Sequence, residues 1–406
     1  MCLTIDNSNN KTITSNTSIS CIFMITLMLL VGCKGETPSP FQDSDEAIAY
    51  DNYMADYNSP KYKWGYIDDQ GALSITNKYD DCRDFSEGLA AVNLDGLWTY
   101  IDKTGTTIMK PRYRAAQIYS EGIGIVQTMA GGFLLYDKSG KVISDTLWYD
   151  NVDNYHDGRA KVKLGSSYGY INPTGTPLDS MPYLGAKAFR NGLAIVQTVR
   201  GPLLIDTSYR PVMPDINNLQ RLYYPSSGIV RVKTDDGYRY YHLGKQSYIG
   251  GTYARGTDFD KAHAVVHDGT SYQLLHKSGK TKRLPYEKVA VGGEGYWIYR
   301  QSGKYGYLEN DGTLLTLANH TTATRYRSGM AAVESGELWG YIDGSGKLVI
   351  NYQYPLAWDY VHDRARMISQ EGYGFINKTG DYIIPPYYIE VRDFSEGLAR
   401  VQIYRQ

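Results

Sequence analysis

The sequence has few cysteines, almost no net charge and only one long hydrophobic run. With 4 Cys in 406 residues, it lacks the dense disulfide framework of a small secreted domain. Its 42 basic and 43 acidic side chains give a formal net charge of -1, so it lacks the basic excess of a nucleic-acid-binding protein. No nucleophile elbow, phosphate-binding glycine loop or zinc-hydrolase motif is present. We therefore expect no catalytic residue, metal site or cofactor.

The hydrophobic run, "ISCIFMITLMLLV" at residues 19–31, contains no charge and is followed by Gly32 and Cys33. Thirteen residues are too few to span a bilayer but fit the central region of a signal peptide. The end of this run, "LVGC", resembles a bacterial lipobox. That resemblance implies cleavage before Cys33 and a diacylglycerol on its sulfur. Residues 1–32 are therefore predicted to be a lipoprotein signal peptide, and Cys33 the lipidation site.

Residues 33–62 are predicted to be a flexible tether, because "KGETPSPFQDSDEA" is polar and contains two prolines. Lys34 after the lipidated cysteine favours the outer membrane over the inner membrane. We expect a cell-envelope protein attached to the membrane at Cys33, facing either the periplasm or the cell surface. Once the signal peptide is removed, Cys82 is the one thiol left besides Cys33. It is expected either to be buried or to link two molecules.

Tyrosine and glycine are abundant, at 39 and 42 residues, which predicts many short strands joined by tight turns. One phrase, "KWGYIDDQG" from Lys63, returns throughout the chain with a period of 33 to 36 residues. Glycine or proline interrupts nearly every ten residues, which excludes helical repeats of similar period. Its opening aromatic, or the residue in that position, is Trp64, Trp98, Phe133, Tyr168, Pro202, Tyr238, Tyr272, Tyr305, Trp339 and Tyr373.

Each unit carries two turn signals. An Asp or Asn four residues after the opening aromatic, with Gly three residues later, predicts a type I turn closed by a left-handed glycine, as at Asp68 and Gly71. A second phrase, such as "FSEGLAAV" from Phe85, predicts an aromatic anchor, a turn and a strand. Together the signals predict about three strands per unit in one antiparallel meander. The acids of the second phrase are interpreted as turn residues: Glu87, Glu121, Asp157 and Glu396.

The phrase "KWGYID…G…FSEGLA-V" resembles the WG repeat, also called the KWG repeat, of bacterial proteins. The resemblance extends from Trp64 to the C-terminus, so residues 63–406 are predicted to be one domain of ten units. Repeats five to seven are degenerate, since Pro202 replaces the aromatic and the turn near Tyr209 lacks its glycine. The resemblance implies a β-rich repeat domain on exported proteins without a common activity.

The expected fold class is all-β, with tandem antiparallel meander repeats stacked as an open or curved solenoid. Ten units exceed the usual four to eight blades of a propeller, which favours the open form. The alternative is one or two propeller-like rings. In a ring, the first strand, "KWGYI", would pair with the last, "LARVQIYRQ", and hide both edges.

Two groups of residues are candidates for binding. His263 and His267 have the spacing of helical metal ligands, but on a strand four residues span about 13 Å, which argues against a shared ion. An aromatic set could stack on sugars or pack on a partner. Its members are Tyr50, Tyr53, Tyr57 and Tyr62.

These observations predict a lipid-anchored, non-catalytic interaction module for a protein or glycan partner. The ligand-binding residues are not assigned. One alternative is a polysaccharide-active hydrolase, whose acids would have to lie in the degenerate repeats five to seven. Another is a structural scaffold of an envelope complex.

Overall fold

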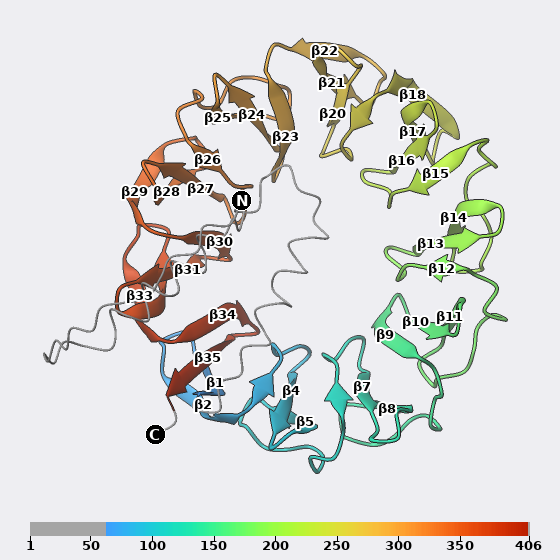
Figure 1. Cartoon of the computed structure of the whole chain (residues 1–406), viewed down its shortest axis with the longest axis vertical. Coiled ribbons are helices and arrows are strands. Elements are labelled where there is room, and N and C mark those ends of the chain that lie inside the picture. The colour runs from blue at the N-terminus through green and yellow to red at the C-terminus, as the bar shows by residue number, and fades with distance from the viewer. Residues whose placement is uncertain (1–61, 405–406) are drawn as a thin grey trace, which may run out of the picture.

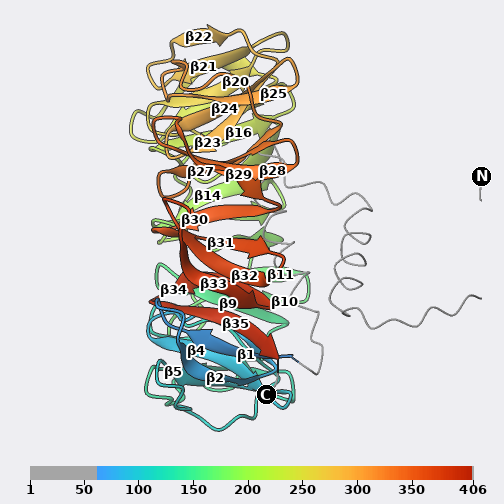
Figure 2. The ribbon, with the colours of Figure 1, turned by 90° about the vertical axis from the view of Figure 1, so that its left-hand side faces the viewer.

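The computed structural model describes residues 62–404, which form ten antiparallel sheets arranged as a closed ring (Figure 1). Seen edge-on, the ring is flat and the strands run across its thickness (Figure 2). Within this part of the chain there is no helix, and hence none that could cross a membrane. The predicted signal peptide, the lipidation site Cys33 and the predicted tether up to residue 61 lie outside the described residues.

We call each sheet a blade. The closure blade consists of β34 (Glu390–Ser395), β35 (Leu398–Tyr404), β1 (Tyr62–Ile67) and β2 (Leu73–Tyr79). The next four blades are β3 (Asp81–Cys82), β4 (Leu89–Leu94) and β5 (Leu97–Asp102); β6 (Ala115–Ala116), β7 (Gly124–Gln127) and β8 (Phe133–Tyr136); β9 (Asn151–His156), β10 (Arg159–Leu164) and β11 (Ser167–Ile171); and β12 (Gly185–Ala186), β13 (Leu193–Thr198) and β14 (Gly201–Asp206).

The remaining five blades complete the ring. They are β15 (Leu219–Leu222), β16 (Ile229–Thr234), β17 (Gly237–His242) and β18 (Ser247–Tyr253); β19 (Arg255–Gly256), β20 (His263–His267), β21 (Tyr272–His276) and β22 (Thr281–Leu284); β23 (Lys288–Gly293), β24 (Tyr296–Gln301) and β25 (Lys304–Leu308); β26 (Thr322–Ala323), β27 (Met330–Ser335), β28 (Leu338–Asp343) and β29 (Leu348–Tyr354); and β30 (Ala357–Val361), β31 (Arg364–Ser369), β32 (Gly372–Asn377) and β33 (Tyr382–Tyr388).

The first strand of each blade faces the centre of the ring and the last lies at the rim, as β9 and β22 show (Figure 1). The all-β meander is confirmed, but the units close into a single ring and not into the open solenoid that the unit count favoured. Closure follows from β1 and β35, which pair from Tyr62 with Tyr404 to Ile67 with Ala399. Each sequence repeat therefore spans the outer half of one blade and the inner half of the next. Because of this offset, the first and last strands of the array pair with each other and complete one blade.

Each blade has four strand positions, whereas the sequence predicted about three strands per unit. In five blades the outer position forms a strand, and in the other five it pairs only through isolated bridges. In the β3–β5 blade, for example, Tyr113 bridges Trp98 and Thr107 bridges Ile101. The intervening segment contains Pro111, which cannot donate to a ladder, so this outer position carries no regular strand signal.

The glycine of the WG pair is required by close packing inside the blade. A β-carbon on Gly65 would lie 2.6 Å from the Ile75 carbonyl oxygen, and one on Gly340 would lie 2.4 Å from that of Ile350. The ladder between the third and outer strands is irregular at this point, between Trp64 and Tyr66 for instance. The irregularity brings the outer backbone over the glycine, so only a residue without a side chain fits.

The many tyrosines hold neighbouring blades together. The tyrosine that follows the WG glycine packs edge-to-face on the anchor aromatic of the next blade, with ring centroids 4.8 Å apart for Tyr66 and Phe85 and 5.1 Å apart for Tyr341 and Tyr360. Its hydroxyl donates to a main-chain carbonyl 17 residues ahead. The donors of this type, at 2.7 to 2.9 Å, are Tyr66, Tyr100, Tyr170, Tyr240, Tyr307 and Tyr341.

The turns also link the blades. Glu87 and Gly88 both have positive φ, 56° and 87°, and form a two-residue hairpin turn between Ser86 and Leu89. The Glu396 carboxylate accepts hydrogen bonds from the N–H groups of Glu87 and Gly88, at 2.5 and 2.8 Å. Equivalent contacts run from Glu87 to Glu121 and Gly122, from Glu121 to Asp157 and Gly158, from Asp157 to Gly192, and from Glu294 to Ser328 and Gly329. The acids predicted as turn residues therefore also cap the next turn around the ring.

Candidate binding surface

Three consecutive blades place basic side chains directly opposite one another on their two inner strands. Residues opposite each other in an antiparallel pair project from the same face of the sheet. We call the six residues the basic arc; five of them are Arg or Lys and the sixth is His. The Cα partners are Arg221 with Lys233, Arg255 with His267, and Lys288 with Arg300.

The arc is confined to one part of the ring. It lies in repeats five to seven, on the opposite side of the ring from the closure blade (Figure 1). Six other blades carry neutral or singly charged pairs at the same register. These are Asp81 with Asn93, Ala115 with Gln127, Asn151 with Lys163, Gly185 with Gln197, Thr322 with Glu334, and Glu390 with Gln402.

Like charges directly across a ladder destabilise a sheet, so the arc lowers the stability of its own fold. At Lys288 the effect is visible in the pKa, which is lowered first by burial and then by the charges of Arg300 and Arg255. The Nε atom of Arg300 is buried and has no hydrogen-bond partner in residues 62–404. A negatively charged ligand bound over the arc would offset the repulsion between its like charges.

We call each of the three opposed pairs a row of the arc, and an aromatic ring extends each row towards the rim. Lys233 lies 5.5 Å from the ring centroid of Tyr238, and Arg300 lies 6.0 Å from that of Tyr305. His267 packs edge-to-face on Tyr272 with centroids 4.6 Å apart. Each row therefore offers two basic groups beside a half-buried ring, which suits an anionic group attached to a flat or apolar body.

The blades of the arc are coupled through Arg231. Its guanidinium stacks on Tyr223, 3.6 Å from the ring centroid, and its Nε donates to Asp258 in the next blade at 2.9 Å. The Arg221 guanidinium lies 4.8 Å from the centroid of the same Tyr223 ring. The first two rows of the arc are thus held in a fixed relation by packed side chains.

The structure places the two histidines considered as metal ligands on β20, as the sequence predicted. His263 Nδ1 lies 2.9 Å from the Asn310 Oδ1 atom, whereas His267 packs on Tyr272 as part of the arc. In the part of the chain from 62 to 404, no three His, Cys, Asp or Glu side chains form a group that could hold a metal ion. The two histidines therefore make separate local contacts.

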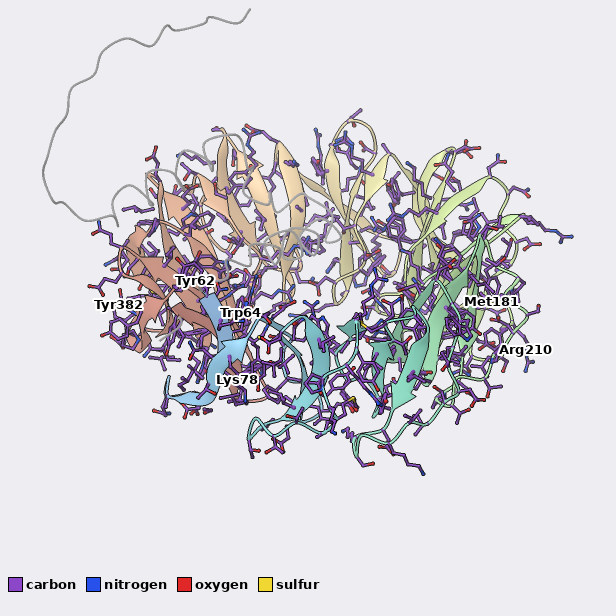
Figure 3. The ribbon with its side chains drawn as sticks, turned by 60° about the horizontal axis from the view of Figure 1, so that its bottom comes forward. Tyr62, Trp64, Lys78, Met181, Arg210 and Tyr382 are labelled. Carbon is purple, nitrogen blue, oxygen red and sulfur yellow. The ribbon has the colours of Figure 1, made fainter. Side chains whose placement is uncertain are left out.

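Of the four tyrosines proposed as a stacking set, Tyr62 alone lies within the described residues. It begins β1, near Trp64 in the closure blade, and is far around the ring from Met181 and Arg210 (Figure 3).

Cys82, for which the sequence left two roles open, is fully buried, and burial raises its pKa to about 12. Burial favours the expectation of a small packed residue over that of a linking thiol.

Sequence reasoning did not identify the arc, although a signal was present. Arg221, Arg255 and Lys288 are spaced by 34 and 33 residues, which equals the repeat period. Aligning the repeats on this inner-strand position would have shown three consecutive basic residues. The opposed residues on the second strand could be assigned only once the register was known.

Comparison with known proteins identifies the repeat. The family model described as "WG containing repeat" matches residues 64–98, 98–128, 339–367 and 373–404. No curated protein sequence matches the chain significantly. The matches lie in repeats one, two, nine and ten and leave the basic arc outside them.

Solved structures with a similar arrangement share little sequence with the chain. A eukaryotic initiation factor is 10% identical with a TM-score of 0.41, covering 79% of this chain and 95% of its own. BamB from Moraxella catarrhalis is 11% identical at 0.30, covering 79% and 95%. PorZ, of the type-IX secretion system of Porphyromonas gingivalis, is 11% identical at 0.26, covering 80% and 53%. At these scores no property of those proteins is transferred. The repeat matches, in contrast, show that the chain contains WG repeats.

Proposed function

We propose that the chain is a lipid-anchored binding ring of the bacterial cell envelope. It is attached to the outer membrane through Cys33, binds a negatively charged protein or glycan with the basic arc, and has no catalytic role. The lipobox sequence supports the anchor and the location. The repeated opposition of basic residues in three consecutive blades supports the binding role, because the fold alone would select against it.

The anionic nature of the partner follows from the charges and rings of the arc. Cationic groups beside aromatic faces bind carboxylates or phosphates on a body that can stack, and both acidic glycans and acidic protein surfaces have these groups. A partner spanning all three rows would contact sites on three blades at once. Such binding weakens as salt is added, because exposed charges are screened.

The test is affinity capture of the chain from its native envelope, with proteins and glycans identified by mass spectrometry. The triple variant Arg221→Gln, Arg255→Gln and Lys288→Gln should retain at least tenfold less of the captured partner than the unaltered chain. A matched control removes three exposed lysines elsewhere: Lys110→Gln, Lys141→Gln and Lys347→Gln. If the arc variant retains as much partner as this control, the proposed site is wrong.

The anchor has a separate test. Replacing Cys33 with alanine should move the protein from the membrane fraction to the soluble fraction and abolish incorporation of labelled fatty acid. Membrane association and fatty-acid labelling that persist in the variant would contradict a lipid anchor at this position.

The hydrolase alternative requires free acids in repeats five to seven. Two acids there have local roles: Asp258 pairs with Arg231, and Asp268 accepts hydrogen bonds from the N–H groups of Thr270 and Ser271. Purified protein is therefore expected to release no product from a broad polysaccharide panel. Cleavage that disappears when an acid of these repeats is replaced would establish the alternative.

The scaffold alternative predicts a stoichiometric partner that co-purifies equally well with the unaltered chain and with the arc variant.

A further inference from the structure

At two neighbouring interfaces of the ring, a tyrosine from the outer strand reaches the next blade. The Tyr354 hydroxyl donates to the Gly380 carbonyl at 3.4 Å, and the Tyr388 hydroxyl donates to the Gly71 carbonyl at 3.0 Å. Both glycines close the tight turn that follows the third strand. The tyrosine ring thus fills the space between an outer strand and the turn of the following blade.

At the preceding interface this tyrosine is replaced by His320. It occupies the same register, because His320 bridges Tyr305 as Tyr354 pairs with Trp339. The imidazole is shorter than a phenol, and its Nδ1 atom lies 3.0 Å from the Tyr352 hydroxyl. The position equivalent to Gly380 and Gly71 is Gly346, and no hydroxyl of this chain's outer strand reaches its carbonyl among the described contacts.

A second exchange changes the packing at the same turn. Four residues before the outer tyrosine, the two neighbouring interfaces have Ile350 and Ile384, which pack against the turn glycines. The equivalent residue here is Thr316, and its methyl group lies nearer to the turn: a β-carbon on Gly346 would lie 2.4 Å from Thr316 Cγ2, against 3.3 Å from Ile350 at Gly380. The side chain that leaves room at this interface is therefore His320.

The two exchanges coincide with a pocket of about 350 Å³, which lies between β25 with its outer segment and the β28–β29 hairpin. Its walls are mixed, and the apolar part consists of Leu315, Leu317, Ile342 and Leu348. The polar part consists of Thr316, Asn319, His320 and Tyr352, beside Gly346. Leu317 is 64% exposed, so one wall of the pocket borders solvent.

The geometry points to a binding site for a phenol ring in this pocket. The ring would take the place that Tyr354 and Tyr388 fill at the neighbouring interfaces, and its hydroxyl would donate to the Gly346 carbonyl. The leucine and isoleucine side chains of the lining can pack against an aromatic ring. The phenol belongs either to a free small molecule or to a tyrosine of a partner protein. This inference stands apart from the proposed function, because it does not depend on the charges of the arc.

The test is a ligand-observed NMR titration of the purified full chain with 4-methylphenol, the side-chain analogue of tyrosine. Saturable binding is expected, at least tenfold tighter than that of toluene, which lacks the hydroxyl, or of methyl glucoside. N-acetyl-tyrosinamide distinguishes the two sources: binding of both phenols indicates a partner's tyrosine, and binding of 4-methylphenol alone indicates a free phenol.

Two variants supply the controls. His320→Tyr restores the ring found at the neighbouring interfaces, so it should weaken 4-methylphenol binding at least tenfold and raise the Tm. Thr316→Ile should also weaken binding without altering His320, which keeps the test decisive if the first variant misfolds. Absence of saturable 4-methylphenol binding, equal binding of toluene or methyl glucoside, or undiminished binding in the folded variants would overturn the inference.

Discussion

Single glycines of the WG pair set how closely the strands of a blade can pack. Gly340 lies under the outer strand, and the backbone above it leaves no room for a methyl group. Its φ is not in the left-handed region, so the constraint is steric and does not depend on the flexibility of glycine. This explains why a large aromatic and a glycine recur side by side: the aromatic fills the interface between blades, and the glycine admits the neighbouring strand.

Replacing Gly340 with alanine should therefore destabilise the ring by about 1–3 kcal/mol, the usual cost of overpacking a core. Gly251 offers a matched control, because a β-carbon there would meet no atom within 4 Å and its φ is ordinary. Urea denaturation of the two variants measures the difference. Equal midpoints for Gly340→Ala and Gly251→Ala would show that the outer strand does not pack as described.

At the scale of elements, the hairpin turns form a chain of carboxylate caps. Burial raises the pKa of Glu396, but the N–H groups of Gly88 and Glu87 and the Lys103 side chain outweigh it, so the pKa is lowered overall. The pKa of Glu87 is lowered in the same way, with burial opposed by Lys138 and by the turn of Glu121 and Gly122. Each cap is therefore most favourable when ionised.

The sign of the resulting pH dependence follows from linkage. A carboxyl whose pKa is lower in the folded chain stabilises the fold at pH values above its unfolded pKa of about 4.3. This contribution is lost as the pH falls through the pKa of the folded state. The double variant Glu87→Gln and Glu396→Gln should lose stability at pH 7 and lose less of it on acidification than the unaltered chain. Denaturation midpoints between pH 7 and pH 3 measure this. Parallel pH profiles would contradict the role of the caps, and Glu371→Gln is the exposed control.

The sequence predicted the elements better than their assembly. The Asp68 side chain accepts hydrogen bonds from the N–H groups of residues 70 and 72, and Gly71 has positive φ, as the turn signal predicted. The caps could not be predicted, because each acid contacts a turn one repeat away. The outer strand was not predicted in the blades where its sequence pattern is interrupted. The exchange of tyrosine for His320 can be recognised only by comparison with Tyr354, which occupies the same register.

At the scale of the whole molecule, the number of units did not decide between ring and solenoid. That choice depends on the angle between adjacent blades, which is set by side-chain packing across each interface and not by the pattern within a strand. The edges favour closure, because an unpaired β1 or β35 would expose a row of main-chain groups. The first and last strands of the array have the sequences that match each other across this seam.

If the ring is closed, the first and last strands can be joined and new chain ends can be placed at another turn. Tyr62 and Tyr404 are Cα partners, so a two-residue Asn-Gly turn should join them, with new ends placed between Gly336 and Glu337 in the β27–β28 turn. This permutant should fold with a Tm close to that of the native order. Opening instead within β28, after Gly340, should destabilise it strongly. Thermal unfolding of both tests the prediction, and failure of the first permutant to fold would count against a closed ring.

The most direct test of the central claim is hydrogen–deuterium exchange across the seam. In the closed ring, β1 and β35 are the two central strands of a four-stranded sheet, as β28 and β27 are in an ordinary blade. Their amides should therefore exchange as slowly as those of β28 and β27. Fast exchange confined to β1 and β35, with β27 and β28 protected, would show that the seam is open and would contradict the ring.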